Sequence, residues 1–255
     1  MSDLATRTLV GIGLIAVALA ALWLGGNAFW LLAVVAALFM MAEWCGLHAA
    51  VPKHKRAAQF ALSIPLAIMS PLASGPSFLA LGFVAGAAFF IAAATRQGQL
   101  GWGAAYVGLP ALALVLLRTQ DGGLLLTVWA MALVWATDIG AYFAGRSIGG
   151  PKLAPAISPN KTWAGLIGGV LAATLFAAFL HVEWQLPFRL AMATPVLAVV
   201  AQGGDLYESW LKRRAGLKDS GNILPGHGGV LDRLDGLVPV APIAALLVEL
   251  PKWLA

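Results

Sequence analysis

Long apolar runs separated by short polar segments follow one another along almost the entire chain. They lie near residues 8–25, 27–47, 60–73, 76–94, 102–117, 124–145, 163–181, 188–208 and 236–250. Runs of about 20 apolar residues are what a hydrocarbon layer about 30 Å thick requires of a helix. Backbone groups in lipid must be satisfied within their own segment, so helices are predicted throughout. We therefore expect an all-α, polytopic membrane helix bundle with about nine transmembrane helices.

Two of these runs need separate comment. The third is short and contains Pro65 and Pro71, which predicts a broken or tilted helix. The first is longer than the apolar region of a secretory signal, and no clear small-residue cleavage site precedes Asn27. We interpret it as a retained span.

The composition agrees with a protein that is surrounded by lipid. Of the 255 residues, 60% are hydrophobic and 11% are charged, and the mean hydropathy is +0.86. No soluble domain is evident. Cys45 is the single cysteine, so an intrachain disulfide is excluded.

The positions of Lys and Arg predict the orientation, because these residues are retained on the cytoplasmic side. A cytoplasmic N-terminus leaves only three of the 16 outside, namely Arg118, Arg189 and Lys252. The net charge of +5 is then explained by topology and by attraction to anionic lipid heads. We do not expect nucleic-acid binding.

The acidic residues divide the chain into two predicted regions. Residues 1–125 offer mainly apolar helices and are expected to be scaffold, so that Glu43→Gln should keep activity. Residues 126–255 are expected to be the catalytic region, with cytoplasmic loops 146–162 and 209–235. Asp138 lies there in VWATDIGAYFAGR, where an unpaired carboxylate costs about 2.5–3.5 kcal/mol. It either pairs with Arg146 or faces a polar cavity and positions a cation or a lysine.

The Gly/Pro-rich segment GRSIGGPKLAPAISPNKTWAG has the composition of a loop that leads into the seventh run. Ser158 and Thr162 are candidate caps for the following helix. A helix N-terminus beside Lys161 would suit an anion such as phosphate. Lysines in such loops also serve topology alone, so this signal is weak by itself.

Near the end of the eighth run, Asp205, Glu208 and Ser209 are three or four residues apart and would share a helix face. Hard carboxylate ligands suit Mg²⁺, and the chain has no Cys/His constellation that would favour zinc. The alternative is a salt bridge with Lys212 or Arg213.

The segment LKDSGNILPGHGGVLDRLDG combines five glycines with several charges. If a helix begins near Leu231, Asp232 and Asp235 share one face. Glycines around His227 would let backbone N–H groups approach phosphates. A solvated turn is the alternative, but it does not explain why so many charges and glycines gather there.

These residues resemble the signature of the phosphatidate cytidylyltransferase family, also called CDP-diacylglycerol synthases. The signature is matched in order by Ser209, Lys212, Arg213, Lys218, Asp219, His227, Gly228, Gly229, Asp232, Arg233 and Asp235. Upstream elements that also resemble the family are Asp138, Ala141, Tyr142, the run Ser158 to Thr162 (with Asn160 and Lys161), Gly204 and Asp205. Many members carry an acid after the Lys-Thr element, where this chain has Ala164.

The resemblance implies that a phosphatidate oxygen attacks the α-phosphorus of CTP and expels pyrophosphate, giving CDP-diacylglycerol. Its implied catalytic residues are Asp205, Lys218, Asp219, Asp232, Arg233 and Asp235. Its implied substrate-binding residues are Asp138, Asn160, Lys161, Ser209, Lys212, Arg213, His227, Gly228 and Gly229. It also implies Mg²⁺ held by Asp205, Asp232 and Asp235, with room for a second cation. We further expect a homodimer among membrane lipids in a bacterial-type inner membrane, with a polar cavity open to the cytoplasm.

Two other functions compete with this interpretation. A CTP-dependent lipid kinase would share the nucleotide and the membrane but would transfer the γ-phosphoryl group to an alcohol. A transporter would also carry intramembrane acids. Transporters often show paired repeats with sites near the midplane, whereas these acids are concentrated in one half of a chain without an evident repeat.

Overall fold

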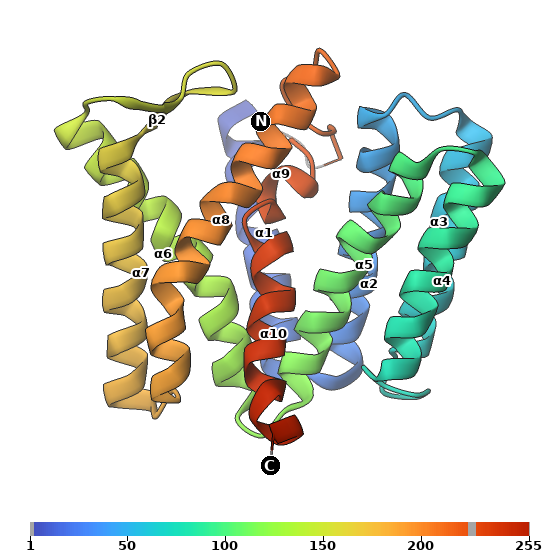
Figure 1. The fold of residues 1–255 in the computed structure, drawn as a ribbon, viewed down its shortest axis with the longest axis horizontal. Coiled ribbons are helices and arrows are strands. Elements are labelled where there is room, and N and C mark those ends of the chain that lie inside the picture. Colours follow the sequence, from blue (N-terminus) through green and yellow to red (C-terminus); the bar gives the residue numbers. More distant parts are fainter. Residues whose placement is uncertain (1–2, 224–227, 255) are drawn as a thin grey trace. The chain divides into compact units, whose positions relative to one another are not determined.

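A computed structural model describes residues 3–223 and 228–254 of the chain. Its helices are α1 (Asp3–Leu24), α2 (Gly26–Leu47), α3 (Pro52–Ile68), α4 (Phe78–Thr95), α5 (Gly98–Thr119), α6 (Gly123–Ile148), α7 (Trp163–Trp184), α8 (Phe188–Arg214), α9 (Leu231–Leu234) and α10 (Leu237–Leu254). Two short strands, β1 (Lys152–Ala154) and β2 (Ser158–Thr162), complete the described elements (Figure 1). The prediction of an all-α fold is confirmed.

Each predicted apolar run coincides with a helix, although not every helix is a clear span. Within the described residues, α2, α4, α5, α6, α7 and α8 are long and apolar enough to cross a membrane. The total of about nine spans stays a prediction. The third run was placed too late, because α3 begins at Pro52 and includes the basic residues that follow it. Pro65 lies inside α3, whereas Pro71 lies beyond its end.

The chain forms two compact units that differ from the predicted division at residue 125. Unit 1 comprises Met1–Thr119 and Ala215–Leu234, and unit 2 comprises Gln120–Arg214 and Asp235–Ala255. The segment 215–234, predicted to belong to the catalytic region, therefore packs with the N-terminal helices.

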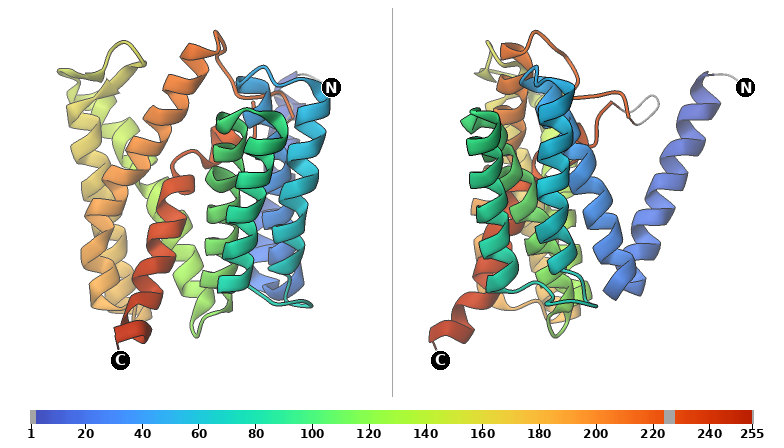
Figure 2. Two further views of the ribbon diagram at one scale, coloured as in Figure 1. Left: turned by 45° about the vertical axis from the view of Figure 1, so that its right-hand side comes forward. Right: turned by 90° about the vertical axis from the view of Figure 1, so that its right-hand side faces the viewer.

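Unit 1 is built on α2, α3, α4 and α5, which lie side by side. α1 packs against α2 and leads away from the other helices of this unit (Figure 2). Indole N–H groups tie these helices together, since Trp30 donates to the Leu66 carbonyl oxygen (2.8 Å) and Trp44 to that of Gln99 (2.9 Å). Trp44 is almost fully buried, so its N–H needs such a partner.

In unit 2, α6 and α7 approach closely because small residues face one another along both helices. A Cβ built on Gly140 would lie 2.5 Å from the Ala172 Cβ, and one on Gly169 would lie 2.7 Å from the Thr137 carbonyl oxygen. No side chain larger than hydrogen fits at either position. Helices in lipid commonly associate through such small-residue contacts. α8 packs against α7 and α6, and α10 packs against α8 and α6.

The segment between α6 and α7, predicted to be a loop, is an antiparallel hairpin of β1 and β2. Lys152 pairs with Thr162 and Ala154 with Ser158. Thr162 caps α7 by accepting a hydrogen bond from the Gly165 N–H (3.0 Å), which confirms its predicted role. Ser158 was wrongly predicted to be a cap, because it begins β2.

Candidate active site

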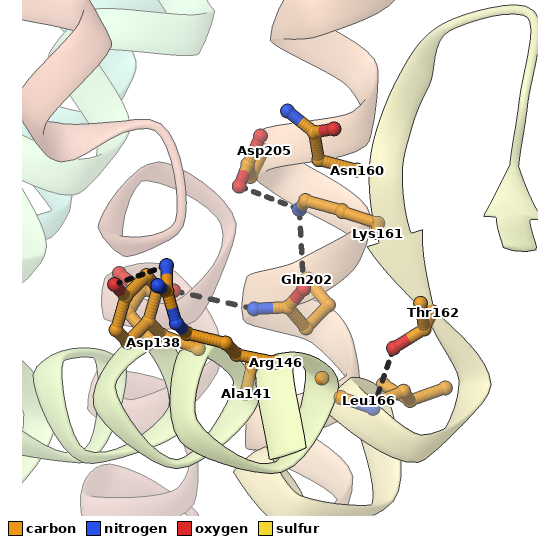
Figure 3. A pocket seen from close by; sticks show the side chains of 12 residues that line it. Asp138, Ala141, Arg146, Asn160, Lys161, Thr162, Leu166, Gln202 and Asp205 are labelled. Carbon is orange, nitrogen blue, oxygen red and sulfur yellow. Dashed lines mark hydrogen bonds and ion pairs between the residues drawn. The ribbon is translucent and has the colours of Figure 1, made fainter. Parts of the chain in front are cut away.

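A cavity of about 590 Å³ lined by both polar and apolar groups lies in unit 2 where the hairpin meets α6, α7 and α8 (Figure 3). This volume is within the range of small-molecule sites. The side chains that line it are Asp138, Ala141, Tyr142, Arg146, Asn160, Lys161, Thr162, Leu166, Gln202 and Asp205, together with Gly145 and Gly165. The structure thus brings four predicted site residues, Asp138, Asn160, Lys161 and Asp205, to one place.

A chain of polar contacts crosses this unit 2 cavity. The Lys161 ammonium lies 2.5 Å from Asp205 Oδ2 and donates to Gln202 Oε1 (3.1 Å). Gln202 Nε2 in turn donates to Asp138 Oδ1 (3.2 Å). Figure 3 shows Gln202 between the lysine and Asp138. Of the two alternatives predicted for Asp138, the one observed is that it faces a cavity. Asp138 is connected to Lys161 through the side-chain amide of Gln202.

Gln202 was not singled out from the sequence. It is buried in α8, three residues before Asp205 and therefore on the same helix face. An amide inside an otherwise apolar run is the signal that could have identified it, because a buried polar group requires partners.

The hairpin places Lys161 beside α8. Its base is closed by the Trp163 N–H, which donates to the Pro151 carbonyl oxygen (3.1 Å). Its turn is reached by Arg213 Nε, which lies 3.4 Å from the Ile157 carbonyl oxygen. Arg213, predicted to bind substrate, thus contacts the hairpin in this structure.

Two further polar pairs lie within α8. Ser209 Oγ donates to Asp205 Oδ1 (3.3 Å), so this predicted neighbour does meet the carboxylate. Lys212 lies 3.2 Å from Glu208 Oε1, and the Glu208 side chain is fully buried. The predicted salt-bridge alternative for Glu208 is therefore the one observed.

Asp235 lies in the turn before α10 rather than on a helix with Asp232. α9 ends at Leu234, so the predicted shared helix face does not form. The pKa of the Asp235 carboxyl is raised to about 7. Burial is the largest cause, and the negative charges of Asp205 and Asp138 add to it. Three carboxyl groups of unit 2 are therefore close enough to repel one another.

In unit 1, a network of hydrogen bonds surrounds Asp232. Asp232 Oδ2 accepts from the Gly229 N–H (2.8 Å), the Ser220 N–H (2.9 Å) and the Ser220 hydroxyl (3.0 Å). Gly228 has a φ of +79°, and a Cβ there would lie 3.0 Å from Asp232 Oδ2. The positive φ and the close approach of the carboxylate both favour glycine at position 228.

Glu43 joins the same network from α2, although the sequence assigned it to scaffold. It is buried and accepts from the Val230 N–H (2.9 Å) and the Leu231 N–H (2.7 Å). The carboxylate of this predicted scaffold residue therefore holds the segment that carries Asp232. An acid inside an apolar run was the available signal.

The other predicted residues of this segment are less enclosed. Lys218, Asp219 and Arg233 are exposed. His227 lies outside the described residues. Roles for these four residues stay predictions.

The donor set of unit 2 fits a hard divalent cation by its chemistry. Carboxylate oxygens are the ligands that Mg²⁺ prefers, and mutual repulsion among Asp138, Asp205 and Asp235 would be relieved by a cation. Among the residues that the structure describes, no group of three or more His, Cys, Asp or Glu side chains lies in position to hold a metal ion. Asp232 belongs to unit 1, so its predicted sharing of a metal with Asp205 stays a prediction.

Comparisons with known proteins agree with this chemistry. A phosphatidate cytidylyltransferase of Brucella suis biovar 1 (strain 1330) is 45% identical over 258 residues, which cover 96% of this chain and 93% of that protein. One of Rickettsia typhi (strain ATCC VR-144 / Wilmington) is 30% identical over 246 residues, covering 93% and 88%. One of Bacillus subtilis (strain 168) is 44% identical over 157 residues, covering 60% and 58%. A model of the cytidylyltransferase family matches residues 5–250, and the chain therefore belongs to that family.

Proposed function

We propose that this membrane protein is a phosphatidate cytidylyltransferase that converts CTP and phosphatidate into CDP-diacylglycerol and pyrophosphate. The observation that carries the proposal is the unit 2 cavity, in which Lys161 is fixed by Asp205 and Gln202. Phosphatidate and CTP are both anionic, so the site must overcome their repulsion. Family membership and the relatives' activity support this substrate pair.

Positioning and charge neutralisation account for the transfer. The attacking phosphate of phosphatidate is largely deprotonated near neutral pH, so a general base is not required. Lys161 and Arg146 line the cavity and supply cationic groups for phosphate oxygens, and Asn160 offers an amide beside them. The capped N-terminus of α7 lies next to Lys161, which further favours an anion there.

Asp205 and Asp235 would hold Mg²⁺ in unit 2, and Asp232 is retained as a further proposed ligand. When bound, Mg²⁺ would neutralise phosphate charge during the displacement. Asp205 carries this assignment most directly, because Ser209 orients its Oδ1 while its Oδ2 contacts Lys161.

The cavity is proposed to open to the cytoplasm of a bacterial cell, in the inner membrane. In unit 2 the basic residues Arg146, Lys161 and Lys212 lie at the ends of α6, β2 and α8 that surround this cavity, as the positive-inside rule favours for a cytoplasmic face. A homodimer is proposed from the family resemblance alone.

Purified protein in detergent, given phosphatidate, Mg²⁺ and CTP labelled at either the α- or the γ-phosphate, tests the reaction. Label from the α-position should enter the lipid extract. Asp205→Asn should abolish this transfer while the protein stays monodisperse, and Glu183→Gln, an exposed acid near the end of α7, should not. Transfer of γ-label would instead indicate a lipid kinase, and transfer of neither would refute the proposal.

A further inference from the structure

The Glu43 carboxylate of α2 is placed where a charge is costly without partners. Its side chain is only 4% exposed and lies in a helix long and apolar enough to span a membrane. Its partners come from the other segment of unit 1: Oε1 accepts from the Val230 N–H, and Oε2 accepts from the Leu231 N–H and the Ser220 hydroxyl (3.1 Å). Two of these three partners are backbone N–H groups of one short stretch, Val230 and Leu231.

This stretch is the start of α9, a helix of four residues. A helix that short cannot satisfy its first N–H groups by internal bonds, so it needs an external acceptor. A side chain close in sequence usually supplies that acceptor. Here the acceptor is Glu43, 187 residues before Val230.

Glu43 and Asp232 are linked through a single hydroxyl group. Ser220 Oγ lies 3.1 Å from Glu43 Oε2 and 3.0 Å from Asp232 Oδ2. A hydroxyl has one hydrogen to donate, so the two carboxylates compete for it. A change at Glu43 therefore alters the surroundings of Asp232 without touching Asp232.

The backbone of two glycines approaches the Glu43 carboxylate closely. A Cβ on Gly229 would lie 2.7 Å from Glu43 Oε2, and one on Gly221 would lie 2.9 Å from Oε1. Both glycines therefore permit a close approach of backbone to carboxylate.

We propose that Glu43 is a positioning residue for cytidylyl transfer, which sets the orientation of Asp232 by holding Ser220 and the first N–H groups of α9. The proposal rests on the proposed function, in which Asp232 acts directly. A purely structural Glu43 would stabilise unit 1 and leave the turnover of correctly folded protein unchanged.

The test compares Glu43→Gln, Glu43→Asp and Ser220→Ala with the wild type, using the α-label assay, and Glu183→Gln is the control. In Glu43→Gln an amide nitrogen replaces one acceptor oxygen, so either Leu231 or Val230 loses its partner. We expect kcat to fall about 10- to 100-fold while both KM values change by less than about threefold. Glu43→Asp, which keeps the charge, should recover part of the loss.

A second readout does not depend on activity. Mg²⁺ should raise the thermal midpoint of the wild type, and the Mg²⁺ concentration that gives half of this rise should be several-fold higher in Glu43→Gln and Ser220→Ala. Wild-type kcat and Mg²⁺ dependence in folded Glu43→Gln would overturn the proposal. If Glu43→Gln does not fold, the same result in Ser220→Ala would overturn it. Absence of transfer by the wild type would count against the proposed function instead.

Discussion

Replacement of Gln202 by Leu removes the hydrogen bonds that this residue makes in the unit 2 cavity and preserves the packing of α8. Gln202 is buried and connects Lys161 to Asp138 through hydrogen bonds of 3.1 and 3.2 Å. Leucine is similar in size and apolar, so the helix keeps its packing while both bonds are lost. The change therefore tests whether the orientation of Lys161 matters for turnover.

The expected size of the effect follows from these contacts. A hydrogen bond to a charged group contributes about 1.5–3 kcal/mol. Lys161 keeps its 2.5 Å contact with Asp205 in the variant, so only part of its positioning is lost. We take about 1.4–2.7 kcal/mol as the loss in transition-state stabilisation, which corresponds to roughly a 10- to 100-fold lower kcat/KM. Removing an amide from an apolar helix should leave the thermal midpoint unchanged or slightly higher.

The assay is steady-state transfer of α-labelled CTP to phosphatidate, with thermal unfolding in detergent measured on the same samples. Thr127→Val in α6 is the matched control, because it removes a buried hydroxyl whose bond runs only to the Gly123 carbonyl oxygen (2.7 Å). Its activity should equal that of the wild type. Wild-type kcat/KM in Gln202→Leu would refute the idea that Gln202 orients Lys161.

Two further predictions concern packing and orientation. Gly168→Leu should lower the thermal midpoint, because a side chain at this position collides with α6 at a cost of about 1–3 kcal/mol. Gly82→Ala is the control and should not lower the thermal midpoint, because a Cβ at this position meets open space. In a Cys45→Ser background, a cysteine at exposed Ser147 should react with an impermeant thiol reagent only in inverted vesicles, and one at exposed Glu183 should react in intact cells. The reverse pattern would overturn the proposed orientation.

The sequence predicted the helices well because the requirement for a membrane helix is local. Run length and apolar character are properties of one segment, and each predicted run overlaps a helix. Errors arose where a helix continues into polar residues. α3 begins at Pro52, a residue favoured in the first turn, and its basic residues were assigned to a connection.

Pairings between distant residues could not be read from local pattern. Asp205 was identified because an acid near a membrane boundary is costly, and Lys161 because it lies beside a predicted helix N-terminus. The amide that connects the lysine to α6 was overlooked. The partners of Glu43 could not be predicted for the same reason, since they lie 177 to 188 residues away. Only the packing within unit 1 reveals that this acid serves the start of α9.

The charge balance of the unit 2 cavity constrains how two anionic substrates can be accommodated. Asp138 and Asp205 line the cavity, and Asp235 is close enough for both charges to raise its pKa. Against these three carboxyls stand Lys161 and Arg146, and Lys161 is already engaged by Asp205. The protein alone therefore offers little surplus positive charge to a triphosphate and a phosphate monoester. We therefore propose that cations accompany the substrates into this cavity, and that its carboxylates, rather than further lysines, are the residues that would hold them.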